Sequence, residues 1–272
     1  MNIWLGAVAL AAMAIAGSAG ASTVEIRHAA ARVTVIPEAR SDVQVSFART
    51  NPRLPMRYGR VGEVTVIDGN LFMRGANCRR GGVGIWGVGF IPYDQLPQVI
   101  VRTPMNVQVK ADKAVFGVIG RADAAQLDNA GCGDWSMANV AGPVSVRVAG
   151  SGDVHAGSAG SALVRISGSS DVSFTDIHNG LSTATAGSGD VRAISVSGPM
   201  HIRVTGAGDV IAKGGQVSEL SVAVAGSGDV KFGGVAGKLD VSIAGSGDVD
   251  VGKVTGPISK HIAGSGSVNV GN

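Results

Sequence analysis

Apolar and polar residues alternate one by one over short stretches in the second half of the chain. One stretch places Val144, Val146 and Val148 at every second position, with Arg147 between two of them, and residues 220–224 repeat the pattern. Side chains of a β-strand point alternately to its two faces. The alternation therefore predicts strands with one apolar face buried and one polar face in solvent.

A short glycine-rich motif follows each of these stretches, with the usual form Gly-Ser-Gly-Asp-Val, as at residues 226–230. The first residues of its copies are 131, 150, 168, 187, 206, 226, 245 and 264. One strand-and-turn unit of about 19 residues, repeated eight times, predicts coils stacked on one another. We therefore predict an all-β fold, a parallel β-helix or solenoid, and its crossovers should be right-handed.

Residues 22–130 contain the same alternation with less regularity, for example in 33–36, 43–47 and 64–67. We expect this N-terminal β region either to start the solenoid or to form a sheet that caps it. The predicted organisation is a signal peptide over residues 1–21, the N-terminal β region over 22–130 and the repeat solenoid over 131–272. Trp135 replaces the motif valine in the first copy, and we interpret it as a plug at the end of the stack.

The chain begins with a segment typical of export. Residues Ile3 to Ala16 are uncharged and apolar, and Ala19-Gly20-Ala21 has the small residues of a signal-peptidase site. We predict secretion across the inner membrane and residence in the periplasm, the outer membrane or the cell surface. No later stretch is apolar enough to span a bilayer, so no transmembrane segment is expected after cleavage.

The charge distribution limits the partners. Residues 22–130 carry 14 Lys and Arg against 9 Asp and Glu, whereas residues 131–272 carry 9 against 11. The basic excess has no run of charges with interleaved aromatic residues, so a nucleic-acid partner is not expected. Two interpretations remain for it, a solvated surface or a face that binds a polyanion.

Taken together, the Gly-Ser-Gly-Asp-Val units and the alternating valines before them resemble the head GIN domain family of autotransporter adhesins. The resemblance implies an exported bacterial β-solenoid with an adhesin-like role. It supplies no catalytic residues to place on this chain.

The motif aspartates are the most regular polar feature. They are Asp134, Asp153, Asp171, Asp190, Asp209, Asp229 and Asp248. In one interpretation each carboxylate accepts backbone N–H groups of its own glycine turn. In the other, the members from Asp153 to Asp248 bind Ca²⁺, which prefers carboxylate and carbonyl oxygens. The turn interpretation is favoured, because each coil supplies one carboxylate, and no metal or other cofactor is predicted.

A glycine-rich segment, residues 77–93, carries Trp86, Phe90 and Tyr93. These aromatic residues either form a lid on the open first coil or a contact surface for a partner, such as a cell-envelope polysaccharide or a protein. Cys78 opens the segment and Cys132 lies in the first motif turn. Because an exported chain meets an oxidising compartment, we predict a disulfide between them that holds the lid on the stack.

No arrangement typical of an active site is present. The five histidines occupy different positions of the repeat, so they do not form a column that would bind a metal or a substrate. Residues 82–87 match the dinucleotide-binding pattern G-x-G-x-x-G, but no helix is predicted after them, as that motif requires. We predict an exported structural or interaction protein of the cell envelope that is not an enzyme. The alternatives are a Ca²⁺-dependent or carbohydrate-binding module and, less favoured, a carbohydrate-active β-helix enzyme.

Overall fold

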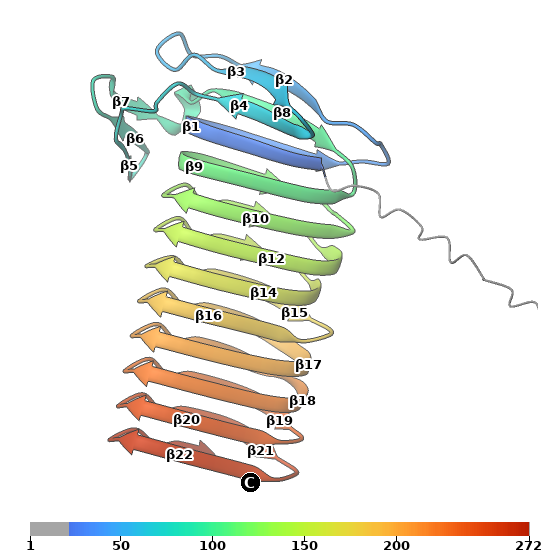
Figure 1. The fold of residues 1–272 in the computed structure, drawn as a ribbon, viewed down its shortest axis with the longest axis vertical. Coiled ribbons are helices and arrows are strands. Elements are labelled where there is room, and N and C mark those ends of the chain that lie inside the picture. Colours follow the sequence, from blue (N-terminus) through green and yellow to red (C-terminus); the bar gives the residue numbers. More distant parts are fainter. Residues whose placement is uncertain (1–21, 272) are drawn as a thin grey trace, which may run out of the picture.

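Residues 22–271, the part of the chain that the computed structural model describes, form a straight stack of β-coils with a cap at its N-terminal end (Figure 1). The predicted signal peptide, residues 1–21, lies outside the described residues. Within the described range, no helix has the length and hydropathy needed to cross a membrane. The predicted all-β parallel solenoid is confirmed.

Two parallel sheets run the length of the stack, and each coil contributes to both. The first sheet consists of β1 (Ser22–Pro37), β9 (Asn106–Ile119), β10 (Ala124–Gly131), β12 (Val140–Gly150), β14 (Ala159–Gly168), β16 (Leu181–Gly187), β17 (Val191–Gly206), β18 (Val210–Gly226), β20 (Leu239–Gly245) and β22 (Ile258–Gly264). The second sheet adds β11 (Trp135–Met137), β13 (Val154–Ala156), β15 (Val172–Ile177), β19 (Val230–Ala236), β21 (Val249–Val254) and β23 (Val268–Val270) to parts of β1, β9, β17 and β18.

Strands of neighbouring coils pair in register, so that equivalent residues form columns. Val222 pairs with Ile202 on one side and Val241 on the other. Val222 and Val224 are each 2% exposed, as the alternation predicted. In β16 two threonines, Thr183 and Thr185, take core positions that hold Val or Ile in the neighbouring coils, and their hydroxyl oxygens have no hydrogen-bond partner.

Each motif forms the turn that joins the first sheet to the second. From the second motif onward, its first glycine has a backbone conformation that other residues avoid, for example φ +125° at Gly187. A Cβ atom on Gly187 would also lie 2.3 Å from the carbonyl oxygen of Gly168 in the preceding coil. Both constraints explain why glycine recurs there.

The N-terminal β region both starts the stack and caps it. Strands β1 and β9 form coils above the first motif, so β9 covers Trp135, whose ring occupies the space left by the missing side chain of Gly117. The interpretation of Trp135 as an end plug is therefore wrong. The division at residue 130 stays a prediction.

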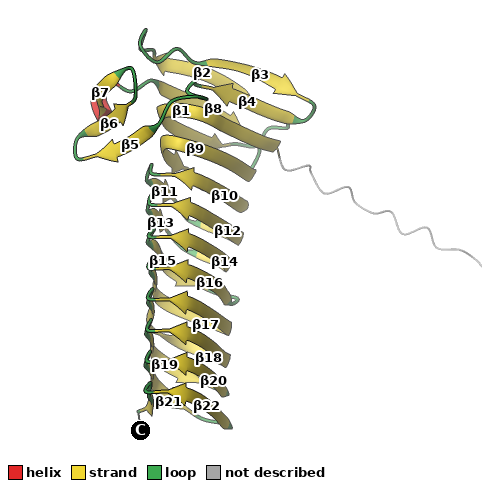
Figure 2. Ribbon diagram, turned by 60° about the vertical axis from the view of Figure 1, so that its left-hand side comes forward, coloured by secondary structure: helices red, strands yellow, loops and turns green. Residues whose placement is uncertain are grey.

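The cap proper lies on β1 at the end of the stack (Figure 2). Strands β4 (Val64–Asp68) and β8 (Gln98–Thr103) pair with β1 in parallel, while β3 (Arg57–Val61) and β2 (Gln44–Arg49) pair antiparallel with β4 and β8. A separate antiparallel sheet, the side sheet, stands beside the first coils. It consists of β5 (Ala76–Arg79), β6 (Gly82–Ile85) and β7 (Gly89–Pro92), followed by a short 3-10 turn, Tyr93–Gln95.

Candidate functional site

The side sheet is fixed by a small core of its own. Val83, Ile85 and Ile91 are buried together with Leu71 and Leu96, next to alanines of β1 and β9. The alternation in β6 and β7 thus directs one face of this sheet toward the stack. Its other face is left to solvent.

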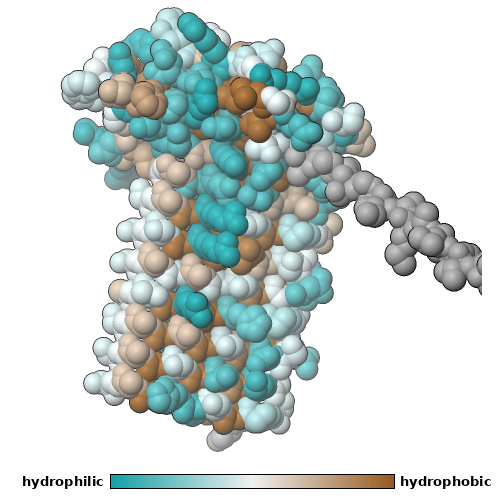
Figure 3. Space-filling view, viewed as in Figure 1, coloured by the Kyte–Doolittle hydropathy of each residue, from teal (hydrophilic) through white to brown (hydrophobic). Residues whose placement is uncertain are grey.

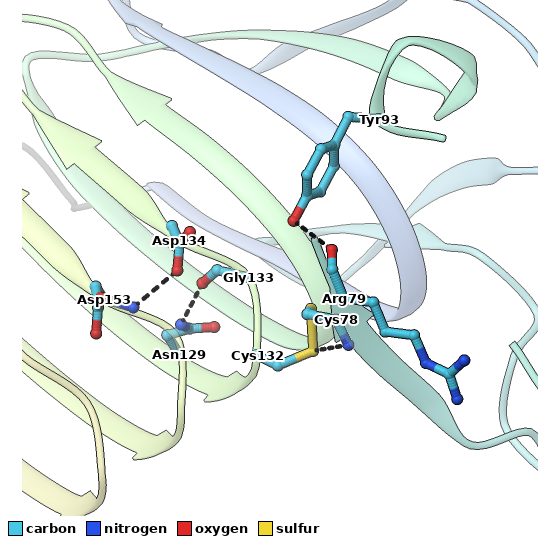
Figure 4. The surroundings of a disulfide bond; sticks show 8 residues. All are labelled: Cys78, Arg79, Tyr93, Asn129, Cys132, Gly133, Asp134 and Asp153. Atoms are coloured by element: carbon cyan, nitrogen blue, oxygen red, sulfur yellow. Dashed lines mark hydrogen bonds between the residues drawn. A yellow bond between two sulfur atoms is a disulfide. The ribbon is translucent and has the colours of Figure 1, made fainter. Parts of the chain in front are cut away.

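A disulfide attaches the side sheet to the repeat. Cys78 in β5 and Cys132 in the first motif turn are bonded, with their Cα atoms 5.8 Å apart (Figure 4). The predicted disulfide is therefore confirmed. It connects the first residues of the side sheet to the turn between β10 and β11, at the edge of the stack where all motif turns lie.

Tyr93 belongs to this attachment and not to an exposed surface. Its ring packs edge-to-face on Phe116 with centroids 4.8 Å apart, and its hydroxyl donates a hydrogen bond to the carbonyl oxygen of Arg79 (Figure 4). Burial raises the pKa of Tyr93, and the negative charge of Asp134 raises it further. The phenol therefore stays protonated and keeps its role as a donor.

The other two aromatic residues of the segment face solvent. Trp86 is 77% exposed and Phe90 is 47% exposed. They border an open hollow of about 440 Å³ on the outer face of the side sheet, which Arg79 and Asn77 also line. The lid interpretation is wrong for these two residues, because the side sheet packs beside the stack and β9 and β1 already cover its first motif coil. The contact-surface interpretation of Trp86 and Phe90 stays a prediction.

Three arginines lie around β6 and its turn to β7, and the sequence pattern did not single them out. A Cβ atom on Gly87 would lie 3.4 Å from Nη1 of Arg74, and one on Gly84 would lie 3.4 Å from Nε of Arg79. Arg53, from the loop after β2, donates a hydrogen bond to the carbonyl oxygen of Val88. The only sequence signal was their density, since residues 49–80 contain seven arginines and two acidic residues.

Two more apolar side chains on this part of the cap were also missed. Phe72 is 66% exposed and Met73 is 81% exposed, both in the loop between β4 and β5. The same loop continues to Gly75, whose carbonyl oxygen accepts the backbone N–H of Trp86. We call the exposed residues Phe72, Met73, Trp86 and Phe90, with Arg53, Arg74 and Arg79, the tip surface. Apolar residues lie among hydrophilic ones on the cap (Figure 3).

A larger hollow, of about 520 Å³, lies along the side of the stack, over the starts of the first-sheet strands from β9 to β17. Its polar lining residues include Gln108, Gln126, Ser145 and His201, and none of its lining residues is Asp, Glu, Lys or Arg. It therefore lacks the paired ionisable groups that general acid–base chemistry needs.

The motif aspartates form a continuous ladder along the edge of the stack. Oδ1 of Asp190 accepts the backbone N–H of Asp209 at 2.8 Å, and Oδ1 of Asp209 accepts that of Asp229 at 2.8 Å. Bonds of the same form, with N···O distances of 2.8–3.0 Å, join Asp134 to Asp153, Asp153 to Asp171, Asp171 to Asp190, Asp229 to Asp248 and Asp248 to Ser267.

The prediction that each carboxylate bonds to its own turn is therefore wrong. In-register stacking brings the equivalent turn of the next coil within reach, so the partner of each carboxylate is 18 to 20 residues further along the chain. The side-chain carboxylate thus accepts the backbone N–H of the next coil's aspartate, as a backbone carbonyl does between paired strands. The carbonyl of the same aspartate accepts from the preceding coil, as Asp209 does from the N–H of Val191 at 2.8 Å.

Part of the repeat matches the sequence model of a known family. Residues 179–272 match the family described as "Putative auto-transporter adhesin, head GIN domain". The resemblance predicted from the repeat is confirmed over this stretch. No curated protein matches the chain significantly.

Solved structures share the fold of residues 179–272 and of the region before them. A putative adhesin from Parabacteroides distasonis superposes with a TM-score of 0.58 at 14% identity, with 92% of each chain covered. A putative lipid binding protein from the same species superposes with a TM-score of 0.54 at 17% identity, with 93% of each chain covered. At such identities the likeness is one of fold.

Along the ladder, one carboxylate oxygen of each motif aspartate is thus engaged by a backbone N–H. Arg192 contacts the other oxygen of two neighbours, Asp171 at 2.9 Å and Asp190 at 2.6 Å. Its hydrogen bond to Asp171 is the main cause that raises the pKa of Arg192. Among residues 22–271, no three His, Cys, Asp or Glu side chains are grouped so that they could hold a metal. The Ca²⁺ hypothesis for Asp153 to Asp248 stays a prediction.

Proposed function

We propose that this chain is an exported, non-catalytic, adhesin-like interaction protein of the cell envelope, and that the tip surface is where it contacts its partner. The observation that carries the proposal is the exposure of Trp86 and Phe90 on a sheet that has its own core and a disulfide. Trp86, with most of its surface in solvent, contributes little to the fold, and contiguous exposed apolar side chains mark interaction sites. A preorganised support also lowers the entropy lost on binding.

The comparisons support this proposal. The matched family is described as a putative auto-transporter adhesin, and one structure of the same fold is named a putative adhesin and another a putative lipid binding protein. In this interpretation the stack is a rigid stalk, and the cap at its N-terminal end carries the contact surface.

The test compares binding of the exported protein to isolated cell-envelope fractions. A variant with Trp86→Ala and Phe90→Ala should lose most of its binding. The matched control is Ile194→Ala, because Ile194 is an exposed apolar residue on the stack, 54% accessible and remote from the cap. The variant and the control should melt at the same temperature as the wild type. Retained binding by the double variant would contradict the proposed contact surface.

Localisation requires its own measurement. Cell fractionation combined with protease treatment of intact cells should find the protein in the envelope fraction, protected if it is periplasmic and cleaved if it is on the surface. Recovery in the cytoplasm would contradict export.

A further inference from the structure

The tip surface combines exposed apolar side chains with uncompensated positive charge. Among the described residues, none of Arg53, Arg74 and Arg79 forms a salt bridge. Of the two acidic residues in 49–80, Asp68 is paired with Arg27 at 2.9 Å. The guanidinium groups around the β6–β7 turn therefore produce a local positive potential with few carboxylates to cancel it.

The apolar members are of types that enter the boundary layer of a lipid bilayer. Trp is favoured at the membrane–water interface, where its ring is buried and its N–H stays near water. Met73 is 81% exposed, and Phe72, whose ring packs edge-to-face on His28 with centroids 5.0 Å apart, keeps 66% of its surface in solvent. A sugar ring would use the aromatic faces, but it would leave Met73 exposed.

We propose that the tip surface binds the surface of an anionic lipid bilayer, with the arginines on lipid phosphates and Phe72, Met73 and Trp86 inserted among the headgroups. This inference rests on the proposed function, because it assigns the partner of the same surface. Basic side chains near a membrane are drawn to anionic lipids, and apolar side chains that enter the interface add to the binding. The interaction weakens as salt screens the charges.

The experiment measures binding to vesicles of phosphatidylglycerol and phosphatidylethanolamine against vesicles of phosphatidylcholine alone. It uses exported protein whose N-terminus has been determined by mass spectrometry, so that every variant carries the same N-terminus. Binding should be strong only to the anionic vesicles and should fall when salt is raised. The variant Arg74→Gln with Arg79→Gln should bind on the order of 30-fold more weakly, since each basic residue near the surface contributes about a factor of five.

A matched variant removes the same charge elsewhere. Arg165 and Arg203 are exposed on the stack, so Arg165→Gln with Arg203→Gln should leave vesicle binding unchanged. Equal losses in the two double variants would overturn the assignment, because they would show an effect of net charge alone.

Tryptophan fluorescence identifies the inserted residue. Trp135 is 1% exposed, so its emission should stay constant when vesicles are added. The emission maximum of Trp86 should shift to shorter wavelength, and brominated lipids should quench that emission. The variant Trp86→Phe should lose both changes. No shift on anionic vesicles would overturn insertion.

The remaining outcomes separate the two proposals. If vesicles are not bound but the Trp86 and Phe90 variant still loses binding to envelope fractions, the contact surface stands and the lipid assignment fails. If dextran sulfate in solution binds as tightly as anionic vesicles, the partner is an anionic polysaccharide and the lipid assignment is likewise wrong. If neither assay depends on the tip residues, both proposals fail.

Discussion

Substitutions at one aspartate of the ladder, Asp209, can distinguish a structural role of the carboxylates from calcium binding. Asp209 accepts the N–H of Asp229 at 2.8 Å, and its side chain forms no salt bridge within the described residues. Asp209→Asn keeps an oxygen acceptor at this place, whereas Asp209→Ala removes it. Both substitutions remove the negative charge. The difference between the two variants therefore measures the hydrogen bond, free of the change in charge.

The magnitudes follow from the geometry. Neighbouring carboxylates lie one strand spacing apart, about 4.8 Å, so each pair repels by about 1 kcal/mol in water. Removing the charge of Asp209 relieves two such pairs, which offsets most of the weakening when a neutral amide oxygen replaces a carboxylate. Asp209→Asn should thus change the free energy of unfolding by less than about 1 kcal/mol. Asp209→Ala leaves the N–H of Asp229 without its acceptor and should be less stable than Asp209→Asn by about 1–3 kcal/mol.

Thermal unfolding followed by circular dichroism measures this difference, which corresponds to about 2–4 °C for each kcal/mol in a protein of this size. The melts are run with EDTA and with Ca²⁺, and neither should move the wild-type midpoint. If Asn and Ala variants melt alike, and Ca²⁺ raises only the wild-type midpoint, the carboxylates act as metal ligands and the acceptor role derived from the ladder is refuted.

Three further predictions concern the core and the cap. Val222→Asp buries a carboxylate without a partner and should lower the free energy of unfolding by several kcal/mol. Ser221→Asp, at the outward-facing neighbour, should lower it little. Equal shifts of the denaturation midpoint would refute the assignment of inward and outward positions. Thr183→Val should stabilise the protein by about 1–2 kcal/mol, because it removes a buried hydroxyl that has no partner and preserves the shape of the side chain; a lower denaturation midpoint would contradict this. Replacing Cys78 and Cys132 by serine should destabilise the cap by up to about 4 kcal/mol, because the disulfide closes a loop of 54 residues, and hydrogen exchange should increase in β5–β7 but not in β20; uniform exchange along the chain would contradict the local role.

The coils could be predicted because their information is local and repeated. The alternation around Val222 fixes which face is buried, and the spacing of the motifs fixes the stacking. What the pattern could not supply was the partner of each aspartate. The bond from Asp209 to Asp229 depends on in-register stacking of two coils, and no single turn contains that information.

The tip surface was predicted only in part for a related reason. Trp86 and Phe90 attracted notice as aromatic residues in a glycine-rich segment, but their direction depends on how the side sheet packs. Arg53 and Arg74 come from other loops and meet the β6–β7 turn only through tertiary contacts. Nothing in their local sequence distinguishes them from the remaining arginines of the region.

The ladder also bears on how such a chain can change in evolution. Each coil offers the coil above and the coil below the same backbone groups and the same carboxylate, so an additional copy would be accepted without new complementary contacts. Recombination within the repeated part of the gene, in steps of about 19 codons, would then lengthen or shorten the stalk by about 4.8 Å per coil. If the tip surface contacts a partner as proposed, its reach would thus change separately from its contact residues, which are encoded in another part of the gene.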